Sequence, residues 1–216
     1  KSKMNERISA FLAERIAAND FPSAVYLVAE KGGVVFHDAL GNAVIEPEVI
    51  PARLDTIYDL ASLTKPLVTG LLAASKIEDR SIALDTTLGS SSSLFEGSSV
   101  SGLTVLQLAT HTSGLPAWIP LYREARSNKQ MDIAATIGEQ TLHASPQVEY
   151  SDLNFISLAF LIGDDRLDAI FEHSVVDQLA LGRTCFEPLS RGIDRSQIAA
   201  SEMGNEYEKQ TCIEKG

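Results

Sequence analysis

The chain contains little cysteine, and its histidines are scattered. Its two cysteines, Cys185 and Cys212, form no C-x-x-C pair and have no metal-ligand spacing. We interpret both as reduced structural thiols, because isolated cysteines usually behave as small buried hydrophobic residues. The four histidines make no H-E-x-x-H or comparable pattern. The sequence therefore predicts neither a disulfide framework nor a metal site, and it implies no cofactor.

Basic residues and long apolar runs are also scarce. The chain has 18 Lys and Arg residues against 29 Asp and Glu residues, which gives a net charge of −11. Such a surface repels phosphate backbones, so nucleic acid is excluded as a partner. No apolar run approaches the ~20 residues of a membrane-spanning helix. No signal peptide is visible, but the opening Lys1-Ser2-Lys3 is compatible with a trimmed leader, so the compartment stays open.

The chain contains enough apolar residues to form a hydrophobic core. The chain is 44% hydrophobic over 216 residues, which fits one domain or two interleaved lobes. Apolar residues at helical spacing predict a helix from Met4 to Ile16, ended by Pro22. Strands follow at 24–29 and 34–37 around a Gly32-Gly33 turn. A hairpin alone is marginally stable, so these strands need further sheet partners.

The middle of the chain is predicted to be mostly helical. We expect Thr104 to cap a short helix and Gly182 to end the last one, with a polar loop at 89–93 and an irregular segment at 112–120. Asp164-Asp165 is interpreted as a solvated turn. The expected helices cover residues 62–74, 105–109, 131–142, 153–162 and 166–181.

Two short motifs indicate chemistry: Ser62-x-x-Lys65 and Tyr150-Ser151-Asp152. Residues at i and i+3 share a helix face, so the serine hydroxyl and the lysine amine lie close together. A serine hydroxyl is a poor nucleophile until a neighbour takes its proton. A lysine does so only when neutral, and burial or nearby positive charge would lower its pKa toward that state. The Ser62 amide at a helix N-terminus could also hold an oxyanion.

Each motif by itself is short enough to occur by chance in a chain of this size. Their occurrence together, in this order, is what indicates a function. Residues 58–65 (YDLASLTK) resemble the nucleophile helix of the serine β-lactamase and penicillin-binding-protein superfamily. Residues 108–116 (LATHTSGLP) are similar to the "LLTHTSGLP" signature of its class C-like branch, which includes carboxypeptidases and related esterases. Residues 150–155 resemble its Tyr-x-Asn element, and 171–188 the segment before its "PLGM" turn.

The resemblance implies a fold. We expect an α/β (α+β), β-lactamase-like fold with an antiparallel sheet flanked by helices and a mostly helical lobe. The division would be 1–55 for the first helix and hairpin, 56–184 for the helical lobe, and 185–216 for a return segment. The sheet looks incomplete in this chain.

The resemblance also implies roles for residues. Ser62 would be the acylated nucleophile, Lys65 would accept or relay its proton, and Tyr150 would be the general base and acid. His111 is a candidate base from its residue type, whereas the resemblance favours support of its loop. Trp118 and Tyr122 either line a substrate cleft or simply pack. The predicted function is a serine hydrolase that acts through an acyl-enzyme on a β-lactam, a D-Ala-D-Ala-type peptide or a carboxylic ester.

The sequence departs from the family in two places. Asp152 stands where the family often has Asn, and a carboxylate cannot donate a hydrogen bond unless protonated. Asp152 would repel a substrate carboxylate, or it could pair with Lys65. The family's Lys-Thr-Gly or His-x-Gly strand, which supplies an oxyanion N–H, is not found after Asp152.

These departures leave a second reading open. We expect the chain to be incomplete relative to its gene product, and so a poor catalyst and an unstable fold by itself. The alternative function is a non-hydrolysing penicillin-binding or sensor homologue. The partner is a small-molecule or peptide substrate, and the oligomeric state stays open. The resemblance slightly favours the cell envelope or periplasm, with the cytoplasm not excluded.

Overall fold

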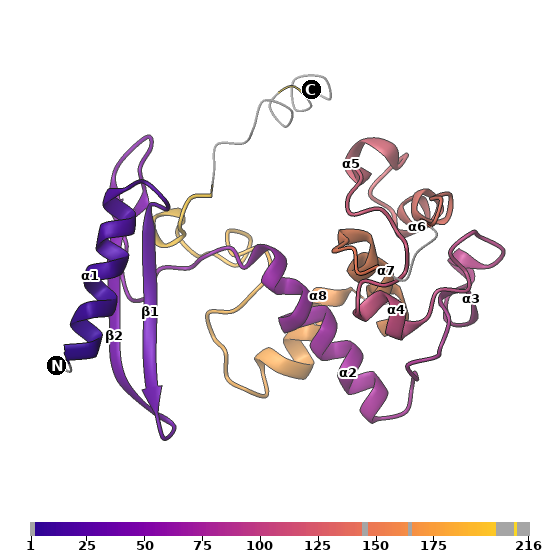
Figure 1. Cartoon of the computed structure of the whole chain (residues 1–216), viewed down its shortest axis with the longest axis horizontal. Helices are drawn as coiled ribbons and strands as arrows, with labels where there is room; N and C mark the ends of the chain where they lie inside the picture. Colours follow the sequence, from indigo (N-terminus) through magenta and orange to yellow (C-terminus); the bar gives the residue numbers. More distant parts are fainter. Residues whose placement is uncertain (1–2, 144–146, 164–165, 202–209, 211–216) are drawn as a thin grey trace. The chain divides into compact units, whose positions relative to one another are not determined.

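A computed structural model of the chain describes residues 3–143, 147–163, 166–201 and 210. The chain divides into two compact units. The first unit joins Lys1–Leu60 to Glu187–Gly216, and the second is Ala61–Phe186. Figure 1 labels their main helices and strands. Cys212 and the turn predicted at Asp164-Asp165 lie outside the described residues.

The first unit is a helix beside a small antiparallel sheet, in the order β1-β2-β3. The predicted opening helix and hairpin are confirmed, although the second strand is longer than expected. The turn between the strands uses left-handed backbone at Lys31 (φ 49) and Gly32 (φ 80), which glycine adopts without a steric penalty. The elements are α1 (Lys3–Ala17), β1 (Ser23–Glu30), β2 (Gly33–Val44) and β3 (Ile50–Pro51).

Helix α1 covers one face of the hairpin. Tyr26 and Asp38 are direct partners across the ladder, so their side chains share a face. Ser9 of α1 is hydrogen-bonded to both, at 2.6 Å to Tyr26 Oη and 2.5 Å to Asp38 Oδ2. The sheet stays small, because β3 has only two residues. The return segment contains a 3-10 helix (Arg195–Gln197) and adds an isolated parallel bridge between Ile57 and Ile198.

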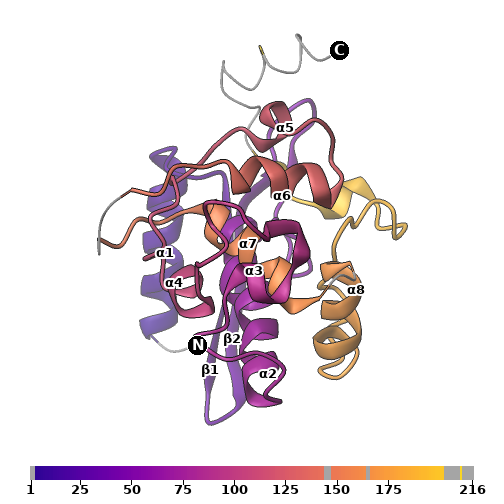
Figure 2. The ribbon, with the colours of Figure 1, turned by 90° about the vertical axis from the view of Figure 1, so that its right-hand side faces the viewer.

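The second unit is built from short helices. Figure 2 shows several of them gathered around α7. The unit begins with a 3-10 helix (Ala61–Leu63) and a π-helix (Lys65–Gly70). It continues with α2 (Leu71–Glu78), α3 (Leu88–Ser91), a 3-10 helix (Ser93–Phe95), α4 (Val105–Ala109), α5 (Leu121–Glu124), α6 (Gln130–Gly138), α7 (Asp152–Ile162), α8 (Leu167–Phe171) and a π-helix (Glu172–Val176).

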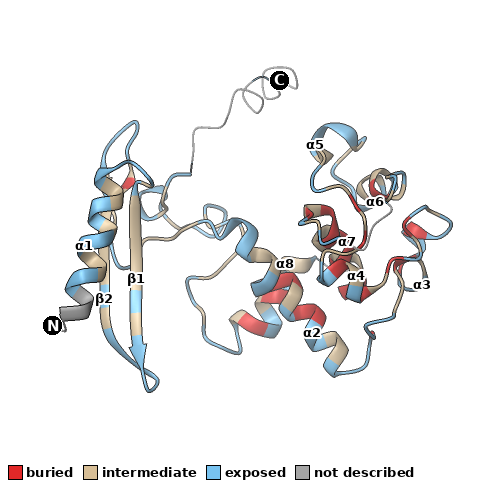
Figure 3. Cartoon of the chain, in the orientation of Figure 1, coloured by how far each residue is buried: buried red, intermediate tan, exposed pale blue. Residues whose placement is uncertain are grey.

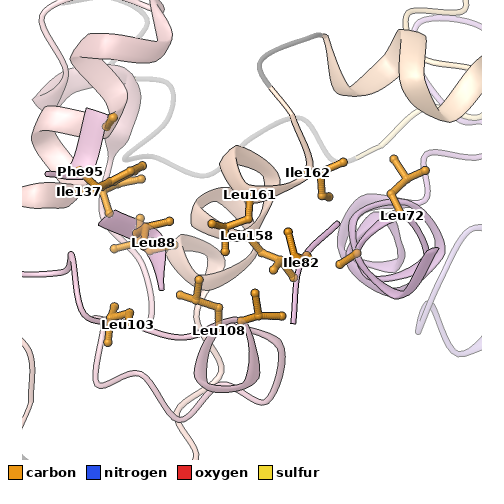
Figure 4. Packing of buried hydrophobic residues seen from close by; sticks show 14 of the residues in the cluster. Leu72, Ile82, Leu88, Phe95, Leu103, Leu108, Ile137, Leu158, Leu161 and Ile162 are labelled. Atoms are coloured by element: carbon orange, nitrogen blue, oxygen red, sulfur yellow. The ribbon is translucent and has the colours of Figure 1, made fainter. Parts of the chain in front are cut away.

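The hydrophobic core of this unit is centred on α7. The helix packs against α2, α3, α4 and α6, and it is apolar around most of its circumference, which is typical of a helix largely covered by others. Figure 3 shows buried residues on α2, α4, α6 and α7. In Figure 4, Leu158 and Leu161 of α7 lie among Leu88, Ile82 and Leu108 from other segments. The centre of this core is therefore the helix that begins two residues after Tyr150.

Local signals predicted some helices well. The cap at Thr104 is confirmed, because its side chain accepts from the Gln107 N–H while the Gln107 side chain accepts from the Thr104 N–H. The predicted irregular segment at 112–120 contains no helix or strand. Both outcomes rest on interactions within a few residues, which sequence patterns report directly.

Other predictions were wrong because tertiary packing decided them. The segment at 89–93 is not a plain polar loop, since residues 89–91 belong to α3 and Ser93 begins the next 3-10 helix, next to the fully buried Leu88 and Phe95. The predicted helix at 131–142 ends at Gly138. The predicted helix at 166–181 ends at Val176, and Ala180 (φ 53), rather than Gly182, has left-handed backbone after it.

Candidate active site

The Ser62 segment begins the second unit with unusual backbone. Ala61 has a left-handed φ of 43°, Ser62 lies in the following 3-10 turn, and Lys65 begins the π-helix. The sequence predicted a regular α-helix here. Pro66 has no N–H to donate within the first turn, and the wider π turn is compatible with that loss. A side chain at Gly70 would lie 3.1 Å from the Lys65 carbonyl oxygen, so the turn also requires a small residue there.

Within this segment, Lys65 contacts Ser62 directly. The Lys65 Nζ atom donates a hydrogen bond to Ser62 Oγ at 3.1 Å. Ser62 is exposed, whereas the Lys65 side chain is only 14% exposed. The predicted proximity of the two side chains is present. The serine faces solvent, where a substrate can reach it, and the ammonium lies behind it.

The second motif reaches this pair from the start of α7. Tyr150 precedes the helix, Ser151 is its N-cap residue and Asp152 is its first residue. The Tyr150 hydroxyl is hydrogen-bonded to Ser62 and Lys65, and Lys65 Nζ lies 5.0 Å from the centroid of the tyrosine ring. Asp152 Oδ1 lies 2.6 Å from Lys65 Nζ. The structure thus brings together the four residues that the two motifs supply, and it realises the Asp152–Lys65 pair that the sequence left open.

The electrostatics of Lys65 depend on its pair with Asp152. Burial lowers the pKa of Lys65, but hydrogen bonds and charge interactions with Asp152 and Tyr150 outweigh it, so the pKa lies above its ordinary value of 10.5. A lysine that accepts a proton would need a lowered pKa and a neutral amine. The pair with Asp152, which the sequence left open, instead favours the ammonium form of Lys65 at neutral pH.

Tyr150 is shifted in the direction that a base requires. Hydrogen bonds from Ser62 and then Lys65 lower the pKa of Tyr150 below 10.0, and the Lys65 charge acts in the same direction. Donors on the phenol oxygen favour the phenolate over the neutral hydroxyl. The geometry therefore pairs a permanent cation with a phenol that gives up its proton more readily than usual.

A polar network behind the site joins the His111 loop to α7. His111 Nδ1 lies 3.1 Å from the Ser151 N–H nitrogen and 3.1 Å from Asn154 Nδ2. Asn154 Oδ1 accepts from Ser113 at 2.5 Å, and Ser151 donates to the Pro116 carbonyl at 2.6 Å. Ser113, Ser151 and Asn154 are all buried. Sequence reasoning assigned no role to these three residues. The available signal for Asn154 was a polar residue within the otherwise apolar first turns of α7.

His111 itself lies beside the tyrosine. Its ring centroid is 4.7 Å from that of Tyr150 and 5.2 Å from that of Phe155. Burial, followed by the charge of Lys65, lowers the pKa of His111 below 6.5. A neutral ring leaves Nδ1 free to accept from the Ser151 amide, which fixes the backbone next to Tyr150. In this geometry, His111 supports the backbone of the Tyr150-Ser151-Asp152 motif.

Trp118 is placed by the same loop. The Asp152 N–H donates to the carbonyl of Ala117 at 2.9 Å, so the residue directly before Trp118 is tied to the start of α7. The Trp118 side chain is 52% exposed, and Tyr122 on α5 is 43% exposed. Neither aromatic side chain is in the core. A role in substrate binding stays a prediction for Trp118.

Other predicted properties concern cysteine, metal and membrane. Cys185 is a half-buried free thiol. Among the described residues, no group of three or more His, Cys, Asp or Glu side chains is arranged to hold a metal ion. None of the helices in the described ranges has the length and apolar character needed to cross a membrane.

Comparison with known proteins agrees with the motifs. The chain is 26% identical to a protein of Salmonella gallinarum (strain 287/91 / NCTC 13346) provisionally named a D-alanyl-D-alanine carboxypeptidase, over 94% of this chain and 52% of that protein. It spans about half the length of the curated relatives it matches. A class C β-lactamase in complex with cefoxitin superposes with a TM-score of 0.73 at 19% identity, covering 91% of this chain and 55% of that chain.

A second solved structure has the same fold. EstCE1, a hydrolase with promiscuous acyltransferase activity, superposes with a TM-score of 0.72 at 24% identity over 91% of this chain and 55% of that one. The Beta-lactamase family model matches residues 8–205, a range that includes both motifs and the His111 loop. This match covers most of the chain, and the chain therefore belongs to the β-lactamase family.

Proposed function

We propose that this chain carries the nucleophile and the proton-transfer groups of a serine hydrolase that forms an acyl-enzyme. The observation that carries the proposal is the convergence of Ser62, Lys65 and Tyr150, with a Lys65–Ser62 hydrogen bond of 3.1 Å and a tyrosine bonded to both. A nucleophile within hydrogen-bond reach of a base, which a third group orients, is the recurring pattern of nucleophilic catalysis.

The charges assign a role to each group. Tyr150, in its phenolate form, takes the Ser62 proton as Oγ attacks the acyl carbonyl, because Lys65 is already protonated. Lys65 stabilises this phenolate before the transfer, through its hydrogen bond and its charge. The backbone N–H of Ser62 is proposed as one donor to the oxyanion of the tetrahedral intermediate. Tyr150 then returns the proton to the leaving group, and the acyl chain stays on Ser62.

Hydrolysis of the acyl-enzyme reverses these proton transfers. Tyr150, now deprotonated, accepts a proton from the attacking water and returns it to Ser62 Oγ as the acid product leaves. The substrate is an ester or a peptide-like amide. The β-lactam, the D-Ala-D-Ala-type peptide and the carboxylic ester all share the carbonyl that this chemistry requires.

Covalent labelling tests the proposal. We expect a fluorophosphonate probe to modify Ser62, as mapped by peptide mass spectrometry, and Ser62→Ala to abolish both labelling and turnover of an activated ester. Ser90→Ala is a matched control, because that serine is exposed on α3 and its Oγ donates to the Thr87 carbonyl rather than contacting Lys65. Label on another serine, with Ser62 unmodified, would refute the assignment.

One observation favours a second candidate, a homologue that is acylated without being turned over. Asp152 occupies a position where an amide could donate to a bound carbonyl, and an ionised carboxylate only accepts. A burst of one equivalent of leaving group without further turnover would identify this binding protein. Steady hydrolysis after the burst would exclude it.

A further inference from the structure

The carboxylate of Asp152 is the solvent-facing member of the ion pair beside the nucleophile. Its side chain is 39% exposed, whereas that of Lys65 is 14% exposed. The two are in contact, with Asp152 Oδ1 2.6 Å from Lys65 Nζ. For a molecule that approaches Ser62 from solvent, the Asp152 carboxylate is therefore more accessible than the Lys65 ammonium.

The other groups around Ser62 add no compensating positive charge. The ring of His111 lies against Tyr150, and its lowered pKa keeps it neutral at pH 7. Tyr150 is negative in the phenolate form that takes the Ser62 proton. The positive charge of Lys65 is therefore shared between Asp152 and the tyrosine oxygen. Among the described residues, the charged groups that act on Lys65 and Tyr150 are each other and Asp152.

We propose that Asp152 is a specificity-determining residue, which selects acyl donors that carry no carboxylate near the scissile carbonyl. The favoured substrates would be neutral or cationic carboxylic esters and amides. This inference rests on the proposed function, since it names the substrate class of the same Ser62 site. Its physical basis is the repulsion between two carboxylates, which is strong at short range in a partly desolvated site.

The size of the effect follows from Coulomb's law. Two like charges ~6 Å apart, at the effective dielectric constant of ~20 that suits groups near a protein surface, repel strongly enough to change a rate by at least about tenfold. Salt weakens such repulsion between partly exposed groups. We therefore expect the preference for neutral substrates to shrink as the ionic strength rises.

The test compares paired aryl esters that share a leaving group and differ only in a carboxylate or a carboxamide on the acyl chain. For the wild-type protein, kcat/KM for the neutral ester should exceed that for the anionic ester by about tenfold or more. Asp152→Asn should reduce this ratio by about tenfold. Asp152→Glu, which keeps the charge, should retain most of it. The ratio within a pair cancels any general loss of rate from a disturbed Lys65.

Asp85→Asn is the matched charge control. Asp85 lies on an exposed turn between α2 and α3, and its removal changes the net charge of the protein by the same amount. It should leave the ratio unchanged. A shift equal to that of Asp152→Asn would show that the overall charge, and not Asp152, sets the selectivity and would overturn the proposal.

Labelling keeps the inference testable if turnover is slow. The rates at which paired neutral and carboxylate-bearing phosphonates modify Ser62 should show the same ratio and the same response to Asp152→Asn. Equal rates for both probes, with Ser62 modified, would refute the selectivity while leaving the proposed nucleophile intact. Absence of Ser62 labelling by either probe would instead overturn the proposed function, and the selectivity inference with it.

Discussion

Gly114 is the residue of the His111 loop that tolerates substitution least. Its φ is 79°, and a Cβ atom added there would lie 2.5 Å from the His143 carbonyl oxygen and 3.3 Å from the His143 nitrogen. The same two residues are joined by a hydrogen bond of 2.8 Å from the His143 N–H to the Gly114 carbonyl. Because the obstructing atoms are backbone, rotation of a side chain cannot relieve the overlap.

Gly97→Ala provides a matched control in the same unit. Gly97 has a similar φ of 73°, but its added Cβ meets nothing within 4 Å. Both substitutions cost about 1–2 kcal/mol for placing a side chain in left-handed backbone. Gly114→Ala adds steric overlap, at about 1–3 kcal/mol, and strains the bond to His143. We therefore expect a total loss of about 2–5 kcal/mol for Gly114→Ala and about 1–2 kcal/mol for Gly97→Ala.

Urea and thermal unfolding, followed by circular dichroism, measure this difference. For a chain of this size, the predicted costs correspond to a melting temperature lowered by about 4–20 °C for Gly114→Ala and about 2–8 °C for Gly97→Ala. Labelling of Ser62 should slow only in Gly114→Ala, because this loop carries His111, which fixes the backbone beside Tyr150. If the two variants unfold at the same temperature, the contact between Gly114 and His143 does not constrain the loop and the reasoning fails.

Three further predictions follow from the site and the core. Tyr150→Phe should slow the acylation of Ser62 by about 10²–10⁴-fold, the usual value of general acid–base catalysis. It should also remove the rise of the acylation rate with pH, whose midpoint lies below 10.0 because the tyrosine pKa is lowered. An acylation rate within about threefold of wild type would exclude that role. His111 is protonated more readily in the unfolded chain than in the folded one, since burial lowers its folded pKa, so the free energy of unfolding should fall as the pH drops below 6.5; urea titrations in which His111→Gln keeps this dependence would contradict the assignment. Leu158→Ala should cost about 2–5 kcal/mol, whereas Leu84→Ala, at a leucine 49% exposed, should cost much less; equal losses in urea unfolding would show that α7 is not the centre of the core.

Local interactions made part of the fold predictable. The opening helix, the Gly32 turn with its two strands and the cap at Thr104 each depend on residues close together in the chain. The polar run at 89–93 misled because periodicity does not report which of its neighbours are buried. Leu88 and Phe95, both fully buried, place that run against the core. The local pattern likewise did not predict that the helical segment expected at 166–181 ends at Val176.

For the site, the sequence by itself identified the residues that we propose to react, and the tertiary structure decided the charge of Lys65. The spacing of Ser62 and Lys65 brings hydroxyl and amine together in any helical turn, and the Tyr150 motif identified the third group. Whether Lys65 is a base or a permanent cation depends on Asp152, which is distant in the chain and 2.6 Å away in space. The contact between the buried Asn154 of α7 and His111 likewise depends on the tertiary structure, because the two residues are distant in the chain. Charge and burial are sums over neighbours, and only the folded chain defines which neighbours those are.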